Sequence, residues 1–448
     1  MYTVGLYTLG CKVSQYETEA IAEEFARAGF TVLPFEDACD VYVINTCTVT
    51  AESDRKSRQM IRRAIHRAPG AVVCVTGCYS QTSPAAVAAM EGVDIVIGSD
   101  KKLSLVKLAA EKLEERDRGA VAAPVVSVGN IDEAAFEPMR ITHAPRTRAY
   151  VKIEDGCECR CTYCEIPNAR GRVRSKTPAD VIAEVEALYR GGTREIVLTG
   201  IETASYGADF AERYRLADLI EELDRRHSCD RVRLGSLSPE VMTADFMSRI
   251  GRLSILVPHF HLSMQSGADA VLRRMKRRYN RTMALQALTR AREAIPDVQF
   301  TTDLMVGFPG ETDADFDDTL RFVGEARFLD AHVFAYSRRP GTPAADYPDQ
   351  VPEDVKRERS ARLIAEKNRV RDEVLTGLVR EGKPLSVVME TKNGNTYTSH
   401  ADTFVEVHVS VPDGAQDLHG KILSVVPVSH KDGHLIAEID NNTMQNNH

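Results

Sequence analysis

The sequence predicts an α/β protein with three parts: an N-terminal doubly wound parallel sheet, a central partial (β/α)6 barrel and a small C-terminal all-β domain. Short apolar runs alternate with amphipathic helical stretches up to about residue 380, and short β-type segments follow one another after it. Continuous apolar strands separated by helices are typical of parallel sheets covered on both faces. A chain of 448 residues has room for two or three domains of about 150 residues each.

Residues 1–116 are expected to form the doubly wound domain. Its apolar runs, which end in or precede Gly, Asn or Thr, lie at 3–9, 41–44, 72–76 and 95–97. The helical stretches between and after them lie at about 15–29, 53–68, 84–90 and 102–116. Residues 117–147 lose this alternation and include Ala- and Pro-rich sequence, so we expect a linker there.

The alternation resumes with longer units in residues 148–380. Candidate strands lie at 149–153, 195–199, 231–235, 259–264, 299–306 and 331–336. Six βα units are fewer than the eight of a complete barrel, and they predict a partial one. A charged helix over about 353–380 ends this domain.

The tail, residues 381–441, changes in character. Its short β-type runs are punctuated by Gly-Asn, Asp-Gly and His-Gly turns. This pattern predicts a small, OB-like β-barrel. The polar end, residues 441–448, is expected to fray.

Charge and hydropathy argue against some classes of protein. Lys and Arg number 57 and Asp and Glu 65, so the formal net charge is −8, which argues against a protein that coats nucleic acid or binds membranes through a basic surface. Neither a signal peptide nor an apolar run of about 18 residues is apparent. We therefore expect a cytoplasmic protein without a membrane partner. In that compartment disulfides are rare, and grouped cysteines, among ten in all, indicate metal binding or catalysis.

Four cysteines fall within eight residues, just after the first strand of the central domain. Cys157, Cys161 and Cys164 have the spacing C-x3-C-x2-C. Three thiolates on one tight loop can hold three irons of a cubane cluster, leaving the fourth iron open to chelate a substrate, as reductive cleavage of a sulfonium needs. A zinc knuckle is the alternative, although it lacks a second cysteine pair in this domain. The extra Cys159 is either a bystander or part of a C-x-C-x2-C set.

A second set of cysteines follows three strands of the N-terminal domain. Cys11, Cys47 and Cys78 each come directly after an apolar run. Doubly wound sheets gather their ligands at the carboxyl ends of parallel strands, so we expect these thiols to meet. The alternative is that they are small buried hydrophobes, which is the interpretation we favour for Cys39, Cys74 and Cys229.

Other residues at the ends of the central strands are expected to form a cofactor pocket beside the cysteine loop. Active sites of barrels lie in the loops after the strands, and glycines there let a backbone approach a ligand closely. The candidates are Tyr163, Gly200, Glu202, Ser236, Gln265, Gly307 and Gly310.

The acidic net charge conceals three basic runs, at about 55–67, 170–176 and 273–281. A single run is usually a solvated face, but three of them near the proposed ligand loops indicate that a polyanion reaches the site. The candidate RNA contacts are Arg62, Arg63, Arg172, Arg174, Lys276 and Arg277.

These motifs resemble those of the radical S-adenosylmethionine methylthiotransferases. The loop 156–171, the segments 10–13 and 45–50 and the triplet 76–78 are similar to the cluster motifs of that family, and the tail is similar to its TRAM domain. Within the family, residues 16–20, 41–47, 56–59 and 82–84 most resemble the branch that acts on N6-threonylcarbamoyladenosine in tRNA.

The resemblance implies two [4Fe–4S] clusters, an auxiliary one on Cys11, Cys47 and Cys78 and a radical-generating one on Cys157, Cys161 and Cys164. It implies that S-adenosylmethionine is both the methyl donor and the source of a 5′-deoxyadenosyl radical, with an external electron donor. The radical would take hydrogen from carbon 2 of the modified adenine beside the anticodon of tRNA, where the methylthio group would then be placed.

The sequence departs from the family pattern at Ser14, at 158–160, at Glu202 and at 261–265. These departures leave fine substrate choice open, so isopentenyladenosine in tRNA and a ribosomal-protein aspartate remain alternative substrates. An alternative of another class is a non-catalytic iron–sulfur protein that binds RNA.

Overall fold

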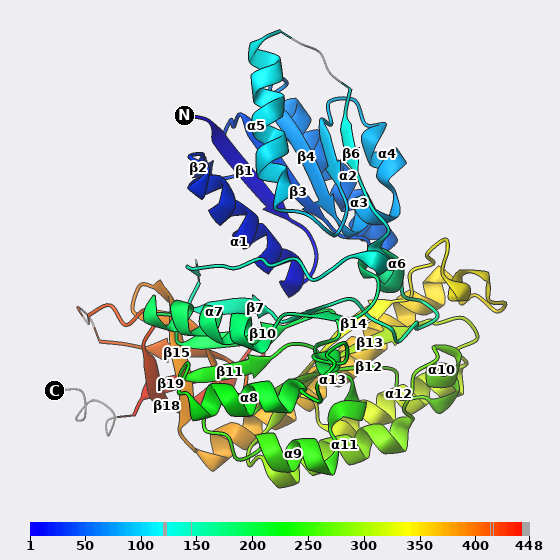
Figure 1. The fold of residues 1–448 in the computed structure, drawn as a ribbon. Coiled ribbons are helices and arrows are strands. Elements are labelled where there is room, and N and C mark those ends of the chain that lie inside the picture. Colours follow the sequence, from blue (N-terminus) through cyan, green and yellow to red (C-terminus); the bar gives the residue numbers. More distant parts are fainter. Residues whose placement is uncertain (120–122, 145, 413, 415, 441–448) are drawn as a thin grey trace.

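The computed structural model describes residues 1–119, 123–144, 146–412, 414 and 416–440. Figure 1 shows an N-terminal sheet with its helices, a half barrel below it and a small β-barrel at the side. The fray predicted for 441–448 lies outside the described residues. Within them, no helix combines the length and the apolar character needed to cross a membrane.

The N-terminal part is a six-stranded, all-parallel sheet in the order β2-β1-β3-β4-β5-β6. Every residue of the central strands β3 and β4 is buried, as a sheet covered on both faces requires. The strands are β1 (Thr3–Thr8), β2 (Thr31–Leu33), β3 (Val41–Thr46), β4 (Val72–Gly77), β5 (Ile95–Ile97) and β6 (Val125–Ser127). The helices are α1 (Lys12–Arg27), α2 (Ala51–Arg67), α3 (Cys78–Thr82), α4 (Pro84–Ala88) and α5 (Ser104–Asp117).

The predicted doubly wound sheet is confirmed, but its two edges were not expected. Strand β6 lies inside the segment 117–147 and pairs with β5, so the sheet extends beyond residue 116 into the predicted linker. Strands β2 and β6 have three residues each and are largely exposed. Each of these strands also adjoins a proline, Pro34 after β2 and Pro124 before β6, so neither has the sequence pattern of a buried strand.

The central part contains the six predicted strands as two parallel three-stranded sheets. Bridges from Val232 to Leu256 and from Leu237 to Leu262 join the two sheets into one partial barrel. The strands are β7 (Arg148–Lys152), β10 (Glu195–Thr199), β11 (Arg231–Leu234), β12 (His259–Gln265), β13 (Gln299–Val306) and β14 (Asp330–Ala335). The helices are α7 (Pro178–Arg190), α8 (Leu216–Arg225), α9 (Ala244–Ile250), α10 (Asp269–Arg274), α11 (Arg281–Ala294), α12 (Asp313–Ala326) and α13 (Glu353–Glu381).

The tail forms a closed five-stranded barrel in the order β15-β16-β17-β19-β18, as predicted. Its strands are β15 (Leu385–Asn393), β16 (Thr396–Ala401), β17 (Glu406–Ser410), β18 (Ile422–Lys431) and β19 (His434–Ile439). The barrel packs on the amino ends of the central strands: Arg148 pairs with Glu390, and the Phe404 ring stacks on His259 at 4.7 Å. The loops at the carboxyl ends are therefore free to build a site.

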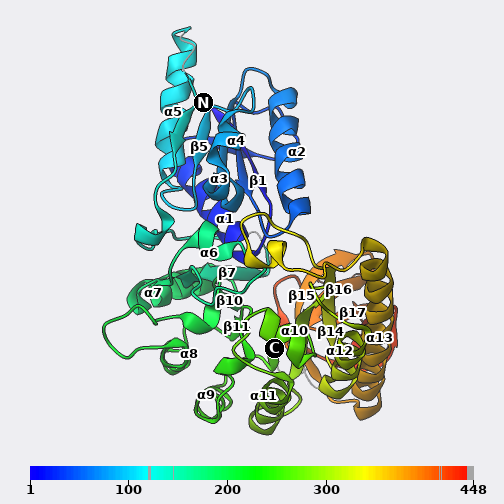
Figure 2. The ribbon, with the colours of Figure 1, turned by 90° about the vertical axis from the view of Figure 1, so that its right-hand side faces the viewer.

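The N-terminal part lies at the other side of the half barrel, with α1 and α6 (Ile166–Arg170) at the junction (Figure 2). Helix α1 contacts β7, and α3 contacts α6. Strands β8 (Glu154–Asp155) and β9 (Arg174–Ser175) form a short antiparallel pair. The cysteine loop and α6 lie between these two strands in the sequence. The junction therefore contains the cysteine loop of one part and the strand ends of the other.

Candidate active site

The loop that carries the crowded cysteines is held by backbone contacts. Gly156 has φ +90°, and a Cβ there would lie 1.9 Å from the carbonyl oxygen of Arg172, so only glycine fits. The Cys157 N–H donates to the Gly171 carbonyl at 3.0 Å, and the Cys164 N–H donates to the Cys161 carbonyl at 3.1 Å. The conformation of the loop is thus fixed before any ligand binds.

A cavity of about 420 Å³ opens beside this loop, a size that suits a small cofactor. It brings together most of the residues that the sequence predicts for the cofactor site. They are Cys157, Cys161, Tyr163, Cys164, Glu202, Ser236 and Gln265. Gln265 has φ +67° at a register shift of β12, and backbone in this sparsely populated region is common at functional sites.

The three predicted glycines do not line this cavity. A Cβ on Gly307 would lie 2.3 Å from Cγ of Lys356, one on Gly200 2.5 Å from Oε2 of Glu154, and one on Gly310 3.3 Å from Nε of Arg274. At these glycines, another part of the protein lies close to the backbone. A glycine in the sequence does not show whether its close neighbour is the protein itself or a ligand. Their contact with a cofactor stays a prediction.

Arg277, predicted to contact RNA, is instead bound to the cysteine loop. Its Nη1 donates to Sγ of Cys161 at 3.2 Å and its Nη2 to the Ser263 carbonyl at 3.0 Å. The guanidinium also lies 5.0 Å from the ring centroid of Tyr279. A cation that donates to sulfur favours the thiolate, which is the form that binds metal. The charge run in the sequence gave no sign of this role.

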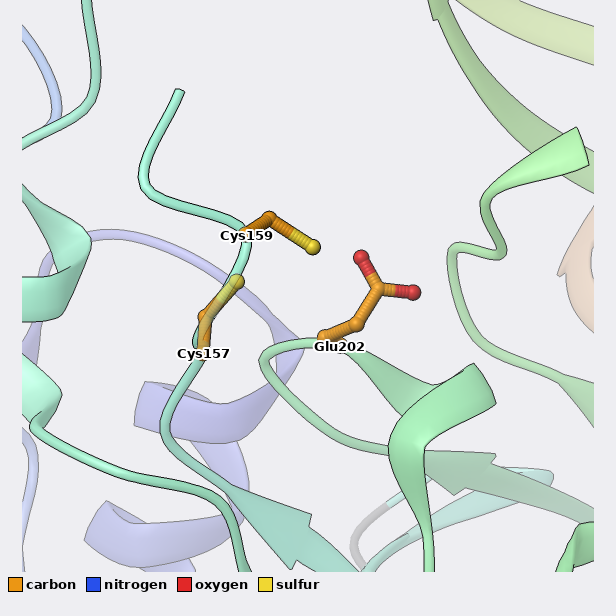
Figure 3. Close-up of side chains that lie close together, drawn as sticks. All are labelled: Cys157, Cys159 and Glu202. Carbon is orange, nitrogen blue, oxygen red and sulfur yellow. The ribbon is translucent and has the colours of Figure 1, made fainter. Parts of the chain in front are cut away.

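Figure 3 shows how Cys157, Cys159 and Glu202 converge. One ligand atom from each lies within 4.8 Å of the other two. A hydrogen bond from Cys157 lowers the pKa of Cys159 to about 6, and the same contact raises the pKa of Cys157. Cys159 is therefore within reach of the ligand set, and the alternative C-x-C-x2-C set stays open.

Two buried polar atoms in the cavity have no hydrogen-bond partner among the described residues: Oε1 of Glu202 and the hydroxyl of Tyr336. Burial, and then the nearby Cys159, raise the pKa of Glu202 to about 7. Buried polar atoms are rarely left unpaired in native proteins. A cofactor with amino and hydroxyl groups, as S-adenosylmethionine has, fits these atoms.

The second set of cysteines lies at one edge of the N-terminal sheet, and its binding of a common ligand stays a prediction. Cys11, Cys47 and Cys78 follow β1, β3 and β4, which are neighbours in the sheet. A Cβ on Gly10 would lie 3.2 Å from Sγ of Cys47. Burial, followed by the Cys78 and Cys11 thiols, raises the pKa of Cys47 to about 11. The topology thus places three thiols at one edge of the sheet.

Arg170, which the sequence analysis treated as part of a basic run, is fully buried at this edge. Its Nε donates to Sγ of Cys78 at 3.1 Å, and its Nη1 lies 2.5 Å from Glu17 and 3.2 Å from Asp155. Lys102 and Lys152 pair with the same Glu17. Arg170 thus brings a positive charge and a hydrogen-bond donor to the sulfur of Cys78. A set of cysteine thiolates suits iron–sulfur ligation.

Comparisons with known proteins agree with this geometry. Residues 151–323 match the Radical SAM superfamily, and residues 3–98 match a family described as uncharacterized protein family UPF0004. The threonylcarbamoyladenosine tRNA methylthiotransferase MtaB of Bacillus subtilis is 43% identical over 95% of this chain and 93% of its own length. The chain belongs to the radical S-adenosylmethionine methylthiotransferase family.

Other relatives of this methylthiotransferase are named for a different tRNA nucleoside. The tRNA-2-methylthio-N(6)-dimethylallyladenosine synthase of Carboxydothermus hydrogenoformans is 32% identical over 96% of this chain and 97% of its own length. Among solved structures, the radical S-adenosylmethionine methyltransferase TsrM of Kitasatospora setae has a TM-score of 0.56 at 18% identity and covers 77% of each chain. That likeness shows a shared fold.

The basic runs of the methylthiotransferase divide into exposed and internal residues. Arg62, Arg63, Arg172 and Lys276 are exposed. Arg174 is buried and donates to the carbonyls of Arg170 and Ile131, at 2.8 and 3.3 Å. Arg174 and Arg277 are thus hydrogen-bonded to other groups of the protein, the other four residues are exposed, and contact of any of the six with RNA stays a prediction.

Proposed function

We propose that this protein methylthiolates carbon 2 of N6-threonylcarbamoyladenosine beside the anticodon of tRNA, in the cytoplasm, with S-adenosylmethionine and two [4Fe–4S] clusters. One structural observation carries the proposal. Val49 and Thr50, just after Cys47, line the same cavity as Cys157, Cys161 and Cys164. The segment that follows Cys47 and the loop that carries the other three cysteines therefore line one cavity, which supports a reaction that uses one radical-generating centre and one sulfur-donating centre.

The cysteines have separate roles in this proposal. Cys157, Cys161 and Cys164 hold the radical-generating cluster, and Cys11, Cys47 and Cys78 hold the auxiliary cluster. When bound, the clusters and S-adenosylmethionine supply the radical, the sulfur and the methyl group of the reaction. Arg277 and Arg170 donate charge-assisted hydrogen bonds to the sulfurs of Cys161 and Cys78 and so orient these ligands.

The remaining residues position the partners. Glu202 and Tyr336 offer their unpaired oxygens to S-adenosylmethionine, and the apolar side chains of Met305 and Phe334 limit water in the cavity. The anticodon stem-loop binds at the exposed cations, which are Arg62, Arg63, Arg172 and Lys276. An external electron donor reduces the radical-generating cluster.

The substrate follows from the relatives. Proteins named threonylcarbamoyladenosine tRNA methylthiotransferase MtaB from Bacillus subtilis, Aquifex aeolicus and Thermotoga maritima are 43%, 37% and 39% identical to this chain. The dimethylallyladenosine synthase of Acidothermus cellulolyticus is 38% identical over 81% of the chain. Isopentenyladenosine in tRNA is therefore the alternative substrate, and the test must distinguish it from N6-threonylcarbamoyladenosine.

Nucleoside mass spectrometry of tRNA from a strain that lacks this protein tests the proposal. We expect the methylthio derivative of N6-threonylcarbamoyladenosine to disappear and its precursor to accumulate. The wild-type gene should restore the product, and a Cys161→Ala gene should not. Loss of the methylthio derivative of isopentenyladenosine instead would assign the alternative substrate, and unchanged tRNA with an unmodified ribosomal-protein aspartate would contradict tRNA as the substrate.

A further inference from the structure

The outer face of the C-terminal barrel carries two imidazoles and a carboxylate, those of Glu406, His408 and His434. On β17, Glu406 and His408 alternate with Val407 and Val409, whose side chains are fully buried. Successive side chains of a strand point to opposite faces. Glu406 and His408 therefore point away from the barrel core.

Strand register brings the third residue to the same face. Strands β17 and β19 pair in parallel, with Val407 opposite Leu435. Leu435 is fully buried, so the preceding His434 lies on the outer face, level with Glu406. The register alone thus predicts that the three side chains are neighbours.

The side-chain geometry agrees with this placement. One ligand atom from each residue lies within 4.8 Å of the other two. Nε2 of His408 is 3.1 Å from Oε1 of Glu406, and the rings of His408 and His434 stack with their centroids 3.8 Å apart. The side chains of His408 and Glu406 are 32% and 41% exposed. The cluster is half-buried and open to ions from solvent.

The backbone around the cluster is rigid. His434 follows a tight hairpin turn in which Asp432 and Gly433 have φ +49° and +80°, as a type I′ turn requires. The β17–β19 pairing is the barrel's one parallel pairing among the described residues. Ligands on paired strands are held more precisely than ligands on loops.

We propose that Glu406, His408 and His434 form a binding site for a divalent transition metal, with Zn²⁺ as the ion that suits them. Two histidines and one glutamate are a known zinc ligand set, which leaves one tetrahedral position open. Here that position faces solvent.

A bound ion would join β17 to β19, which are separated in the sequence by β18. It would thereby stabilise the pairing of these two strands in the barrel. Lys431 on β18 lies opposite His434 and is the nearby positive charge to consider. Because Lys431 is exposed, its long side chain can keep the ammonium in solvent, away from a bound ion. This site is independent of the iron–sulfur chemistry proposed above.

Calorimetric titration of the full-length chain with Zn²⁺ tests the site. The iron–sulfur centres are loaded anaerobically beforehand so that their cysteines are occupied. We expect one Zn²⁺ per chain, and at least tenfold weaker binding in Glu406→Gln and in His408→Ala. His419→Ala is the matched control, since His419 is exposed on the same barrel and its Nδ1 donates to the Glu390 carbonyl, 2.6 Å away. That variant should bind as the wild type does.

X-ray absorption at the zinc edge identifies the ligands of the bound ion. We expect nitrogen and oxygen neighbours with the outer-shell pattern of imidazole. Sulfur neighbours at about 2.3 Å would place the ion on cysteines and overturn the proposal. So would unchanged affinity in Glu406→Gln, a variant that keeps the shape of the side chain and whose fold circular dichroism can confirm.

Discussion

Arg170 donates a hydrogen bond from Nε to Sγ of Cys78 across 3.1 Å. Arg170 ends α6, the helix that begins two residues after Cys164, and Cys78 begins α3 in the N-terminal part. A side chain from the helix that follows the cysteine loop therefore contacts a cysteine of the other set. Hydrogen bonds to ligand sulfur raise the reduction potential of iron–sulfur clusters and help to retain them.

Replacing Arg170 should alter the proposed auxiliary cluster. Arg170→Gln removes a charge that faces Cys78, so we expect weaker retention of that cluster by about 10–100-fold. Iron per chain after anaerobic reconstitution should then fall from about eight toward about four. Arg170→Lys keeps the charge near Glu17 but cannot reproduce the fork of hydrogen bonds. The Arg170→Lys variant should retain its iron. In an EPR-monitored titration, the reduction potential of its auxiliary cluster should be lower than that of the wild type. Equal potential and equal iron in both variants would contradict this role.

Glu17 should stabilise the junction between the N-terminal part and the half barrel. It is fully buried and pairs with Lys102, Lys152 and Arg170. Glu17→Gln removes the carboxylate that these three buried cations share, and breaking such a network costs about 3–5 kcal/mol. Thermal melting followed by circular dichroism should show a clear loss of stability. The control is Glu52→Gln, an exposed partner of Arg55, which should leave the melting temperature unchanged.

Gly156 should be irreplaceable in the cysteine loop. Alanine there would place Cβ 1.9 Å from the Arg172 carbonyl oxygen at φ +90°, and a backbone atom cannot move aside cheaply. We expect Gly156→Ala to lose the radical-generating cluster and the reductive cleavage of S-adenosylmethionine. Gly29→Ala is the matched control, because Gly29 has φ +88° with nothing within 4 Å of its Cβ position. If both variants cleave S-adenosylmethionine equally, the steric argument is wrong.

The order of strands and helices could be predicted from the sequence because it follows from the pattern of apolar residues. Buried strands leave apolar runs, and in a parallel sheet each strand end lies at the same edge, so Cys11, Cys47 and Cys78 could be grouped without a structure. Arg170 and Arg277 could not be assigned, because a charge run looks the same whether it faces solvent or a buried thiol. The contacts that decide their roles join residues 92 and 116 positions apart.

Replacing single cysteines should separate the two proposed centres. Cys47→Ala removes one ligand of the auxiliary set only, so we expect 5′-deoxyadenosine to form while the methylthio product does not. Cys161→Ala removes a ligand of the other set and should abolish both. Chromatography of the two products on the reconstituted enzyme measures this. A Cys47→Ala enzyme that still makes methylthiolated nucleoside would refute the role assigned to Cys47, whereas Cys229→Ala, at a buried thiol outside both sets, should retain both activities.

The exposed cations on α2 should set the salt dependence of tRNA binding. Each phosphate contact contributes about −0.7 to −0.9 to the slope of log K against log salt concentration. Arg62→Ala and Arg63→Ala should each weaken binding and reduce the magnitude of that slope by about one unit. Fluorescence anisotropy with labelled tRNA between low and physiological salt measures both quantities. Arg225→Ala supplies the control, since Arg225 is 71% exposed on α8, outside the basic runs, and its loss should leave the slope unchanged. A slope that Arg62→Ala and Arg63→Ala do not alter would place the tRNA on another face, because a phosphate contact cannot be lost without changing the number of counterions released.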